Sequence, residues 1–323
     1  MTVSIIIPAY NAAAYLPRSI EAAIRAGSQV QGRWELILVD NGSTDATPEI
    51  IAAAAEAHPD TVVAAYTARR GAPAARNHGT ALSSGEWLQF LDADDTIAPE
   101  KIAHQLSLAG DADWVIGAYR HLFTDGMIED TLPHPDPWRG LFHNFRTGHT
   151  ISNLLRRSAL DRVGGWDESL SNNQDPDLHF RLLREGVPYV LDNHIASFYH
   201  HHDGQRITSA DLGHAHRNRA NMLAAAIDHL HTHLPSHWAA HSAYFLGGLL
   251  ATLRRLATYD LRAATTFYRH YFDRRGGYTS SHTYPLVPRY ARLYPYLGFG
   301  RLEWLRTSLA TVLPRGLKDL LKS

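Results

Sequence analysis

Three carboxylates stand within four positions directly after a short apolar run. The run, residues 87–91, predicts a buried strand, and Asp92, Asp94 and Asp95 follow it. Because unpaired buried carboxylates are costly, we expect the strand to deliver them to its carboxyl end, where open α/β sheets bind ligands. Alternation along an extended chain would place Asp92 and Asp94 on the same side, with Ala93 opposite.

This arrangement favours a divalent metal site. Carboxylate oxygens are the preferred ligands of Mg²⁺ and Mn²⁺, whose remaining positions are commonly filled by water and substrate phosphates. The chain has no cysteine, which excludes disulfides, zinc–thiolate sites and thiol catalysis. The alternative is an aspartate-rich turn that caps the next helix, since aspartate is favoured in turns and caps.

A second acid-rich loop follows another predicted strand. Residues 34–39 form an apolar run, and Asp40 and Asp45 stand in the loop after it. The carboxyl ends of parallel strands meet at one edge of a sheet, so the two acidic loops are expected to lie together. Their coincidence strengthens the prediction of a site.

The surrounding pattern is an alternation of strands and helices. Continuous apolar strands at residues 3–7, 34–39, 61–66 and 87–91 are separated by helical periodicity, which predicts a Rossmann-like α/β fold with a mostly parallel sheet covered by helices. Another strand is expected at 113–119, and the proline-rich stretch 133–138 is expected to be a loop over the site. From about residue 211 the pattern becomes helical, so we expect an α/β domain over residues 1–210 and a helical C-terminal region over residues 211–323.

The composition bounds the partners and the compartment. The 323 residues are 45% hydrophobic and 20% charged, as in ordinary soluble proteins. The net charge of −1 gives no basic field for nucleic acid. We find no signal peptide and no run of 18 apolar residues, so a cytoplasmic protein is expected.

The C-terminal residues 302–323 suggest a contact with a membrane surface. Basic residues alternate there with leucines and Trp304, a composition that can lie on the inner, anionic face of the cell membrane. The alternative is a terminal helix docked on the protein itself. The basic residues are Arg306, Arg315, Lys318 and Lys322.

Taken together, the first 95 residues resemble the family 2 glycosyltransferases of the GT-A fold. Order and spacing match as well as residue type, and a looser resemblance extends to about residue 205. The matching segments are residues 4–11 (SIIIPAYN), 35–45 (ELILVDNGSTD), 75–79 (ARNHG), 85–87 (GEW) and 90–95 (FLDADD), then 156–160 (RRSAL), 164–168 (GGWDE) and 174–178 (QDPDL).

The resemblance implies an inverting transfer of a sugar from a nucleotide-diphosphate donor, most simply a UDP-sugar, to an acceptor hydroxyl. Asp40 would accept the imide N–H of the base, while Pro8 and Tyr10 would pack against it. Arg76 would meet the diphosphate with a charge-assisted hydrogen bond. Asp92 would reach the ribose or the water shell of the metal.

The resemblance also assigns the metal and the base. Asp94 would ligate Mn²⁺ or Mg²⁺, and His202 would contact the metal or a phosphate, although a solvated histidine run explains residues 200–202 equally well. Inversion needs a base on the acceptor side, and Asp175 inherits that role from an acidic pair that here is Gln174-Asp175. From the residues alone, Asp175 could equally be a helix N-cap.

Two other classes of function compete with this interpretation. A sugar-nucleotide nucleotidyltransferase would carry a glycine-rich phosphate loop after its first strand, and residues 8–12 contain no glycine. A non-catalytic carbohydrate- or partner-binding protein on the same fold would not need both Asp94 and Asp175. The resemblance implies a glycan or glycolipid acceptor and a role in cell-envelope biogenesis. Neither the sugar nor the acceptor can be identified from the sequence.

Overall fold

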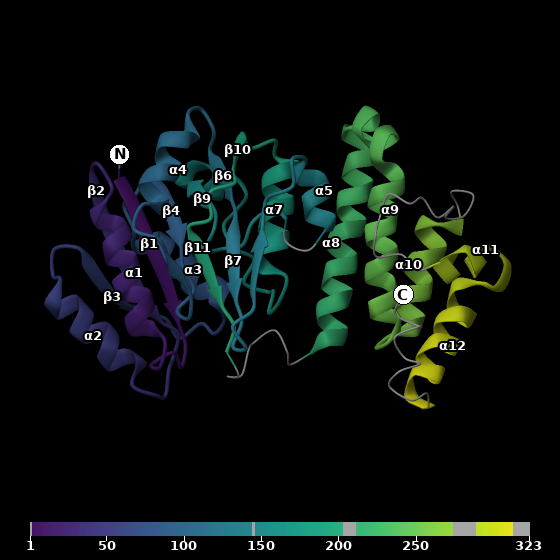
Figure 1. Cartoon of the computed structure of the whole chain (residues 1–323), viewed down its shortest axis with the longest axis horizontal. Coiled ribbons are helices and arrows are strands. Elements are labelled where there is room, and N and C mark those ends of the chain that lie inside the picture. The colour runs from purple at the N-terminus through teal and green to yellow at the C-terminus, as the bar shows by residue number, and fades with distance from the viewer. Residues whose placement is uncertain (1, 144–145, 203–210, 274–288, 313–323) are drawn as a thin grey trace. The chain divides into compact units, whose positions relative to one another are not determined.

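The computed structural model describes residues 2–143, 146–202, 211–273 and 289–312 (Figure 1). The chain divides into two compact units, residues 1–205 and residues 206–323. Unit 1 contains strands and helices, whereas the described part of unit 2 is entirely helical. The predicted α/β fold with helices after it is therefore confirmed. Arg315, Lys318 and Lys322 lie outside the described residues.

Unit 1 is built on a seven-stranded sheet in the order β10-β6-β9-β4-β1-β2-β3. Its strands are parallel except β9, which runs antiparallel to both β4 and β6. The strands are β1 (Thr2–Ala9), β2 (Arg33–Asp40), β3 (Val62–Tyr66), β4 (Trp87–Phe90), β6 (Trp114–Gly117), β9 (Leu154–Arg156) and β10 (Tyr189–Asp192).

Helices cover both faces of this sheet, which explains the continuous apolar strands (Figure 1). On one face, Ile5 and Ile7 of β1 share a core with α1 (Leu16–Ser28). On the other, Ile6 meets α3 (Ala72–Leu82) at Gly79, where an added Cβ would lie 2.6 Å from the Ile6 side chain. Glycine therefore lets α3 pack closely on the sheet.

The remaining helices of unit 1 connect successive strands. Most enter with a proline or a polar residue in the first turn, as helix starts commonly do. They are α2 (Thr47–Ala57), α4 (Lys101–Ala109), α5 (Pro137–Phe142), α6 (Arg157–Arg162) and α7 (Gln174–Arg184).

A second, four-stranded sheet has the order β5-β11-β7-β8. Its strands are β5 (Thr96–Ile97), β7 (Tyr119–Leu122), β8 (Ile128–Thr131) and β11 (Ser197–His200). The prediction of one strand over 113–119 was wrong, because the chain leaves the main sheet after β6 and enters the second sheet as β7. At Gly117 a Cβ would lie 2.1 Å from the carbonyl oxygen of Ser152, so a side chain there would block this crossing.

The predicted loop at 133–138 is also partly wrong, because α5 begins at Pro137. The carboxylate of Asp136 caps this helix by accepting hydrogen bonds from the backbone N–H groups of Trp138 and Arg139. Proline is well suited to the first position of a helix, where its missing N–H has no intrahelical partner. The prolines thus start a short helix rather than exclude one.

The described part of unit 2 is a group of packed helices. Helix α8 packs on α9, α9 on α10 and α10 on α12. In the described ranges, none of these helices has the length and apolar content needed to cross a bilayer. The elements are α8 (Leu212–His233), α9 (Pro235–Ala257), α10 (Leu261–Tyr271), a 3₁₀ helix (Arg289–Leu293), α11 (Tyr294–Leu297) and α12 (Phe299–Val312).

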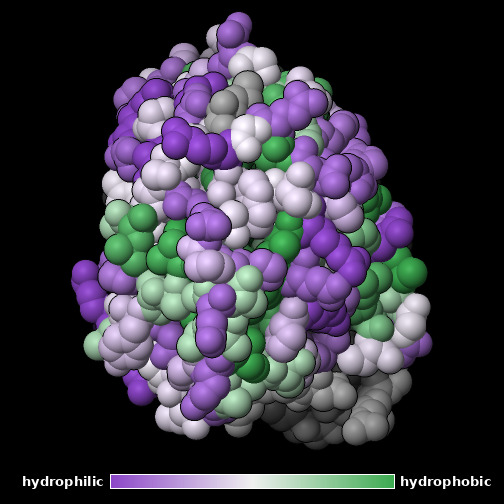
Figure 2. Space-filling view, turned by 90° about the vertical axis from the view of Figure 1, so that its left-hand side faces the viewer, coloured by the Kyte–Doolittle hydropathy of each residue, from purple (hydrophilic) through white to green (hydrophobic). Residues whose placement is uncertain are grey.

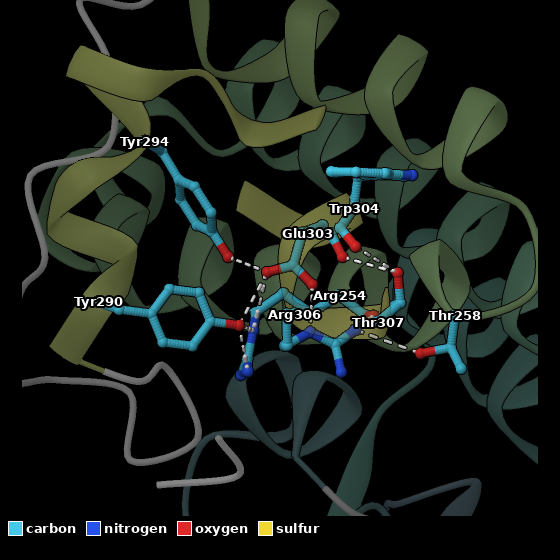
Figure 3. A network of polar contacts seen from close by, with 8 residues as sticks. All are labelled: Arg254, Thr258, Tyr290, Tyr294, Glu303, Trp304, Arg306 and Thr307. Atoms are coloured by element: carbon cyan, nitrogen blue, oxygen red, sulfur yellow. Dashed lines mark hydrogen bonds and ion pairs between the residues drawn. The ribbon is translucent and has the colours of Figure 1, made fainter. Parts of the chain in front are cut away.

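A buried carboxylate fastens α12 to its own unit (Figure 3). Glu303 is fully buried and accepts hydrogen bonds from the hydroxyls of Tyr290 and Tyr294. The guanidinium of Arg306 donates a 2.5 Å hydrogen bond to Glu303, and Arg254 lies 3.5 Å from it. Residues 299–312 therefore form a helix docked on their own unit, which was the alternative expected from the sequence.

The side of unit 1 that carries α2 and β3 shows hydrophobic residues in separate patches among hydrophilic ones (Figure 2). A shallow apolar groove between α1 and α2 is lined by side chains such as Ile20, Ile24 and Ile50. Edge strand β3 exposes Tyr66. The groove lining contains none of the acidic-loop residues, whereas Tyr66 pairs in register with Asp40, where the first acidic loop begins.

Candidate active site

The first acidic loop begins where β2 ends beside β1. Asp40 pairs in register with Ala9 of β1 and is 6% exposed. Its Oδ1 accepts a 3.1 Å hydrogen bond from the backbone N–H of Ser43, which leaves Oδ2 as a further acceptor. A buried carboxylate at this sheet edge can receive an N–H group from a ligand.

The loop after β1 supplies an aromatic side chain at the same edge. Tyr10 is 42% exposed and lies under the guanidinium of Arg70, whose Cζ is 5.5 Å from the ring centroid. Arg70 also donates a 3.1 Å hydrogen bond to the Tyr10 hydroxyl. Pro8 is the last-but-one residue of β1 and is half-buried. Pro8, Tyr10 and Asp40 are therefore brought to one edge, as the sequence predicts.

Arg76 of α3 is the central cation of the site. It is only 4% exposed, and its Nη2 donates a 2.7 Å hydrogen bond to Oδ1 of Asp92. Its Nη1 donates a 2.8 Å hydrogen bond to Oε1 of Gln174, the residue before Asp175. The guanidinium also lies over the ring of Trp166 at 4.5 Å. Arg76 thus joins the acidic turn to the start of α7.

The acidic residues after β4 do not continue the strand. β4 ends at Phe90, and the backbone turns so that Asp95 N–H donates to the carbonyl oxygen of Asp92. The expected alternation of Asp92 and Asp94 was therefore wrong, because it requires an extended chain. The capping alternative also fails for α4, whose N-cap is Glu100. Asp95 is 1% exposed and accepts a 2.8 Å hydrogen bond from the His200 backbone.

The side chain of Asp94 contacts His202 and is not paired with Asp92. The Nε2 atom of His202 lies 2.8 Å from Oδ2 of Asp94, and the imidazole stacks on Tyr15 with ring centroids 4.5 Å apart. The two residues that sequence similarity assigns to the metal are thus brought into direct contact. A carboxylate and an imidazole this close are a donor pair that a divalent cation can use.

Asp175 lies in the first turn of α7, whose N-cap is Asn173, so the N-cap alternative for Asp175 is wrong. Its side chain is 14% exposed, and Oδ1 accepts a hydrogen bond from the Thr150 hydroxyl. Burial by itself raises the pKa of Asp175, but the nearby His149, Arg76 and His179 and the Thr150 hydrogen bond together hold the pKa below its usual value. The carboxylate is therefore ionised and able to accept a proton.

His149 is a site residue that the sequence did not reveal. Its Nε2 lies 3.9 Å from Oδ2 of Asp175. One ligand atom each from His149, Asp92 and Asp95 also lies within 4.8 Å of the others, close enough to share a metal ion. A lone histidine in a segment without periodicity carries no signal of this role. The imidazole therefore lies near both the acidic turn and Asp175.

A neutral histidine lies beneath Asp175. His179 is 2% exposed, and burial lowers its pKa to about 4 against the opposing effect of Asp175. Asn153 Oδ1 accepts from Gly117 N–H, so its amide nitrogen must donate to His179 Nε2 at 2.9 Å. His179 Nδ1–H then donates to the Thr147 hydroxyl, also at 2.9 Å. This assignment fixes the tautomer and leaves Asp175 as the only ionised group of the pair.

Comparison with known proteins identifies the family of the chain. Residues 4–164 match the model of the family described as Glycosyl transferase family 2. The matched region contains Asp40, Arg76, Asp92 and Asp94. The chain therefore belongs to family 2 glycosyltransferases and carries their GT-A domain.

Curated relatives match over part of their length. The chain is 34% identical over 220 residues to the succinoglycan biosynthesis protein ExoO of Rhizobium meliloti, covering 62% of this chain and 61% of that protein. It is 29% identical over 221 residues to an uncharacterized glycosyltransferase of Rickettsia typhi, covering 64% and 66%. The matched regions thus span less than two thirds of either relative.

Solved structures share the fold over most of the chain. Staphylococcus aureus TarS 1-349, solved in complex with UDP-GlcNAc, has a TM-score of 0.60 at 15% identity and covers 97% of this chain and 92% of that one. The mannosyltransferase PcManGT of Pyrobaculum calidifontis, solved with GDP-Man and Mn²⁺, has a TM-score of 0.52 at 18% identity, covering 97% and 87%. At these identities the likeness shows the fold alone.

Proposed function

We propose that the chain is an inverting hexosyltransferase that moves a sugar from a nucleotide-diphosphate donor to an acceptor hydroxyl. The observation that carries this proposal is the position of Asp175. The ionised carboxylate of Asp175 lies 3.9 Å from His149, and His149 lies near Asp92 and Asp95 of the acidic turn. The residue before Asp175, Gln174, accepts a hydrogen bond from Arg76. A proton acceptor and a set of phosphate- and metal-binding groups thus adjoin each other.

The donor would bind along the edge formed by β1, β2 and the acidic turn. Asp40 accepts the imide N–H of uracil, a donor that adenine lacks at this position, while Pro8 and Tyr10 pack against the base. Arg76 exchanges part of its contact with Asp92 for the diphosphate, since guanidinium groups bind phosphate with charge-assisted hydrogen bonds. Asp92 is then available to the ribose. UDP is the preferred nucleotide, although structural neighbours were solved with UDP-GlcNAc and with GDP-Man.

Asp94 and His202 would hold Mn²⁺ or Mg²⁺, and their 2.8 Å contact supports this assignment. The histidine favours Mn²⁺ over Mg²⁺, because Mg²⁺ is bound mainly by oxygen. When bound, the cation would neutralise charge on the leaving nucleoside diphosphate. Asp92, Asp95 and His149 form a second set of possible metal ligands.

Asp175 would act as the general base. It removes the proton from the acceptor hydroxyl as that oxygen forms a bond to the anomeric carbon from the face opposite the phosphate. The bond from the anomeric carbon to the diphosphate oxygen breaks in the same step, and its electron pair leaves with the nucleoside diphosphate. A single displacement of this kind inverts the anomeric configuration. The Thr150 hydroxyl and His149 orient the carboxylate.

The acceptor is proposed to be a glycan or glycolipid of the cell envelope, in keeping with the name of the ExoO relative. Residues 1–210 would be the transferase domain and 211–323 a helical appendage. Donors and acceptor would be met in the cytoplasm. Release of UDP from a panel of UDP-sugars with Mn²⁺ tests the proposal. A nucleotidyltransferase would release pyrophosphate instead, and a binding protein would release neither.

We further propose that the outward face of α12 touches the inner face of the membrane. Its inward face is held by Glu303, whereas Trp304 is 57% exposed and Leu305 and Leu309 are each 45% exposed. Figure 3 shows Trp304 directed away from the Glu303 carboxylate. A surface helix usually buries its apolar side chains and exposes its charged ones, whereas α12 exposes Trp304, Leu305 and Leu309 and buries Glu303. An exposed apolar face is typical of a helix that lies at a membrane interface. Sedimentation with anionic vesicles should capture the protein, and Trp304→Ser should weaken that capture. Neutral vesicles should capture less.

A further inference from the structure

Three buried polar side chains donate hydrogen bonds to the consecutive carbonyl groups of residues 151–153, which follow Thr150, a partner of Asp175. Gln89 of β4 donates to the carbonyl of Ile151 at 3.0 Å, and Gln105 of α4 donates to that of Ser152 at 3.0 Å. Lys101 of α4 donates to the carbonyl of Asn153 at 3.3 Å. Each donor is at most 1% exposed. The lysine ammonium also donates to the Gln89 amide oxygen, which connects these two donors, while the Gln105 amide also donates to Asp192.

The clamped segment carries the groups that touch Asp175. The carbonyl of His149 accepts hydrogen bonds from the N–H groups of Ser152 and Asn153, at 2.9 and 3.3 Å, which closes a turn over residues 149–153. The Ser152 hydroxyl accepts from His149 N–H at 2.9 Å. Thr150, within this turn, donates its hydroxyl to Asp175. Fixing the three carbonyls therefore fixes both His149 and Thr150.

A buried lysine is an expensive way to satisfy two oxygen acceptors. Transfer of an ammonium group out of water is costly unless geometry and hydrogen bonds compensate, and an apolar side chain of similar volume often stabilises a core better. Among the described residues, no carboxylate lies within ion-pair distance of Lys101, whose partners are an amide and a carbonyl. Its retention at this place is explained if the position of the turn matters more than the stability gained by an apolar residue.

We propose that Lys101, with Gln89 and Gln105, is a positioning residue for the general base. The three side chains hold the 149–153 turn in the position in which Thr150 and His149 orient the Asp175 carboxylate toward the acceptor. The substrates touch none of the three. This role rests on the proposed transferase activity. It leaves the donor-binding groups Asp40 and Arg76 unaffected, because neither contacts the turn.

The test compares Lys101→Met with Ile102→Val, a variant of the neighbouring fully buried residue that removes only apolar contact. Lys101→Met should lower kcat by on the order of 10- to 100-fold, as small misplacements of catalytic groups do. Its Kd for UDP should stay within about twofold of wild type, since Asp40 and Arg76, which are proposed to bind the base and the diphosphate, make no hydrogen bond to the described turn. Ile102→Val should keep kcat. Gln105→Met, which releases the Ser152 carbonyl and the Asp192 carboxylate but no other carbonyl of the turn, should show a smaller loss of kcat and serves if Lys101→Met does not fold.

A double-mutant cycle separates positioning from general destabilisation. Thr150→Val removes the contact with Asp175, so adding Lys101→Met to it should cost much less in kcat than it does alone. Independent, additive losses would overturn the proposal. So would a kcat for Lys101→Met and Gln105→Met no lower than that for Ile102→Val.

Amide hydrogen exchange gives a readout that needs no turnover. Lys101→Met should speed exchange at Ser152 and Asn153, whose N–H groups close the turn, more than at the backbone N–H groups of β6 and α7. Uniform protection changes would overturn the clamp itself. If wild type releases no nucleoside diphosphate from any donor, the transferase role fails and the positioning role fails with it. Exchange then still decides whether Lys101 holds the turn.

Discussion

The Nε2 atom of His149 lies 3.9 Å from Oδ2 of Asp175. The same imidazole lies close enough to Asp92 and Asp95 to share a cation with them. A single side chain thus spans the distance between the proposed base and the acidic turn after β4. The two halves of a displacement reaction, proton removal and stabilisation of the leaving group, need this proximity.

Asp175→Asn tests the base. The amide cannot accept the acceptor proton, so kcat should fall by about 10²- to 10⁴-fold, while the Kd for UDP stays near that of wild type. Coupled detection of released UDP measures the first quantity and calorimetry the second. Asp177→Asn is the matched control, because that carboxylate lies in the same helical turn but pairs with Arg181 at 2.7 Å. Equal losses in the two variants would place the base elsewhere.

The dependence of kcat on pH tests the environment of Asp175. Burial raises its pKa, but His149, Arg76, His179 and Thr150 together lower it below the usual value. The base works when deprotonated, so kcat should remain flat until the pH falls through this lowered pKa. His149→Gln removes one of the lowering charges, and the acidic limb should move to higher pH. A limb that stays in place would mean that His149 does not influence the base.

Asp94→Asn tests the metal assignment. The concentration of Mn²⁺ that gives half-maximal UDP release should rise at least about tenfold, and His202→Ala should raise it less. Removal of divalent cations with a chelator should abolish turnover in wild type. Asp111→Asn, at an exposed turn after α4, should leave the Mn²⁺ requirement unchanged. If Asp92→Asn and His149→Gln raise the Mn²⁺ concentration needed for half-maximal UDP release while Asp94→Asn does not, the cation is bound by Asp92, Asp95 and His149 instead.

Asp40→Ala tests recognition of the base. Loss of an acceptor for the imide N–H should weaken UDP binding roughly tenfold or more, the usual effect of removing a hydrogen bond to a charged group. Binding of ADP should change little. Because Asp40 also accepts from Ser43 N–H, thermal unfolding should be followed in parallel. An equal loss for both nucleotides would indicate a structural effect of the substitution.

Much of unit 1 could be predicted because its strands are short, apolar and separated by strong helix periodicity. The same features predicted which loops meet at the carboxyl edge, and hence that Asp40 and Asp92 lie in one region. The prediction that Asp92 and Asp94 lie on the same side was wrong because β4 ends at Phe90 and a turn follows. Tertiary contacts set the end of this strand. The split of residues 113–119 between two sheets also depends on packing, at Gly117 against Ser152.

The parts of the site that sequence could not predict are those made by long-range contacts. His149 stands in a segment without periodicity, and only the fold brings it to Asp175. Lys101, Gln89 and Gln105 occupy positions that look like the polar side of ordinary elements. Their burial follows from the pairing of β4 with β9, which carries the 149–153 turn beneath them. Such polar networks leave no local pattern to detect.

Lys101 should impose a distinctive pH dependence on stability. Burial lowers the pKa of this lysine to about 7, with Asp192 opposing the shift, whereas in the unfolded chain it titrates near its ordinary value of about 10.4. Between these values the unfolded state binds a proton that the folded state lacks, so this group makes the protein more stable as the pH rises from 7 toward 10. Lys101→Met removes that contribution. Its free energy of unfolding relative to wild type should therefore fall with pH, by up to about 1.4 kcal/mol per pH unit, in urea titrations at pH 7, 8 and 9. For Ile102→Val the difference from wild type should be the same at each pH, and a parallel result for Lys101→Met would mean that the lysine is not held in a low-dielectric site.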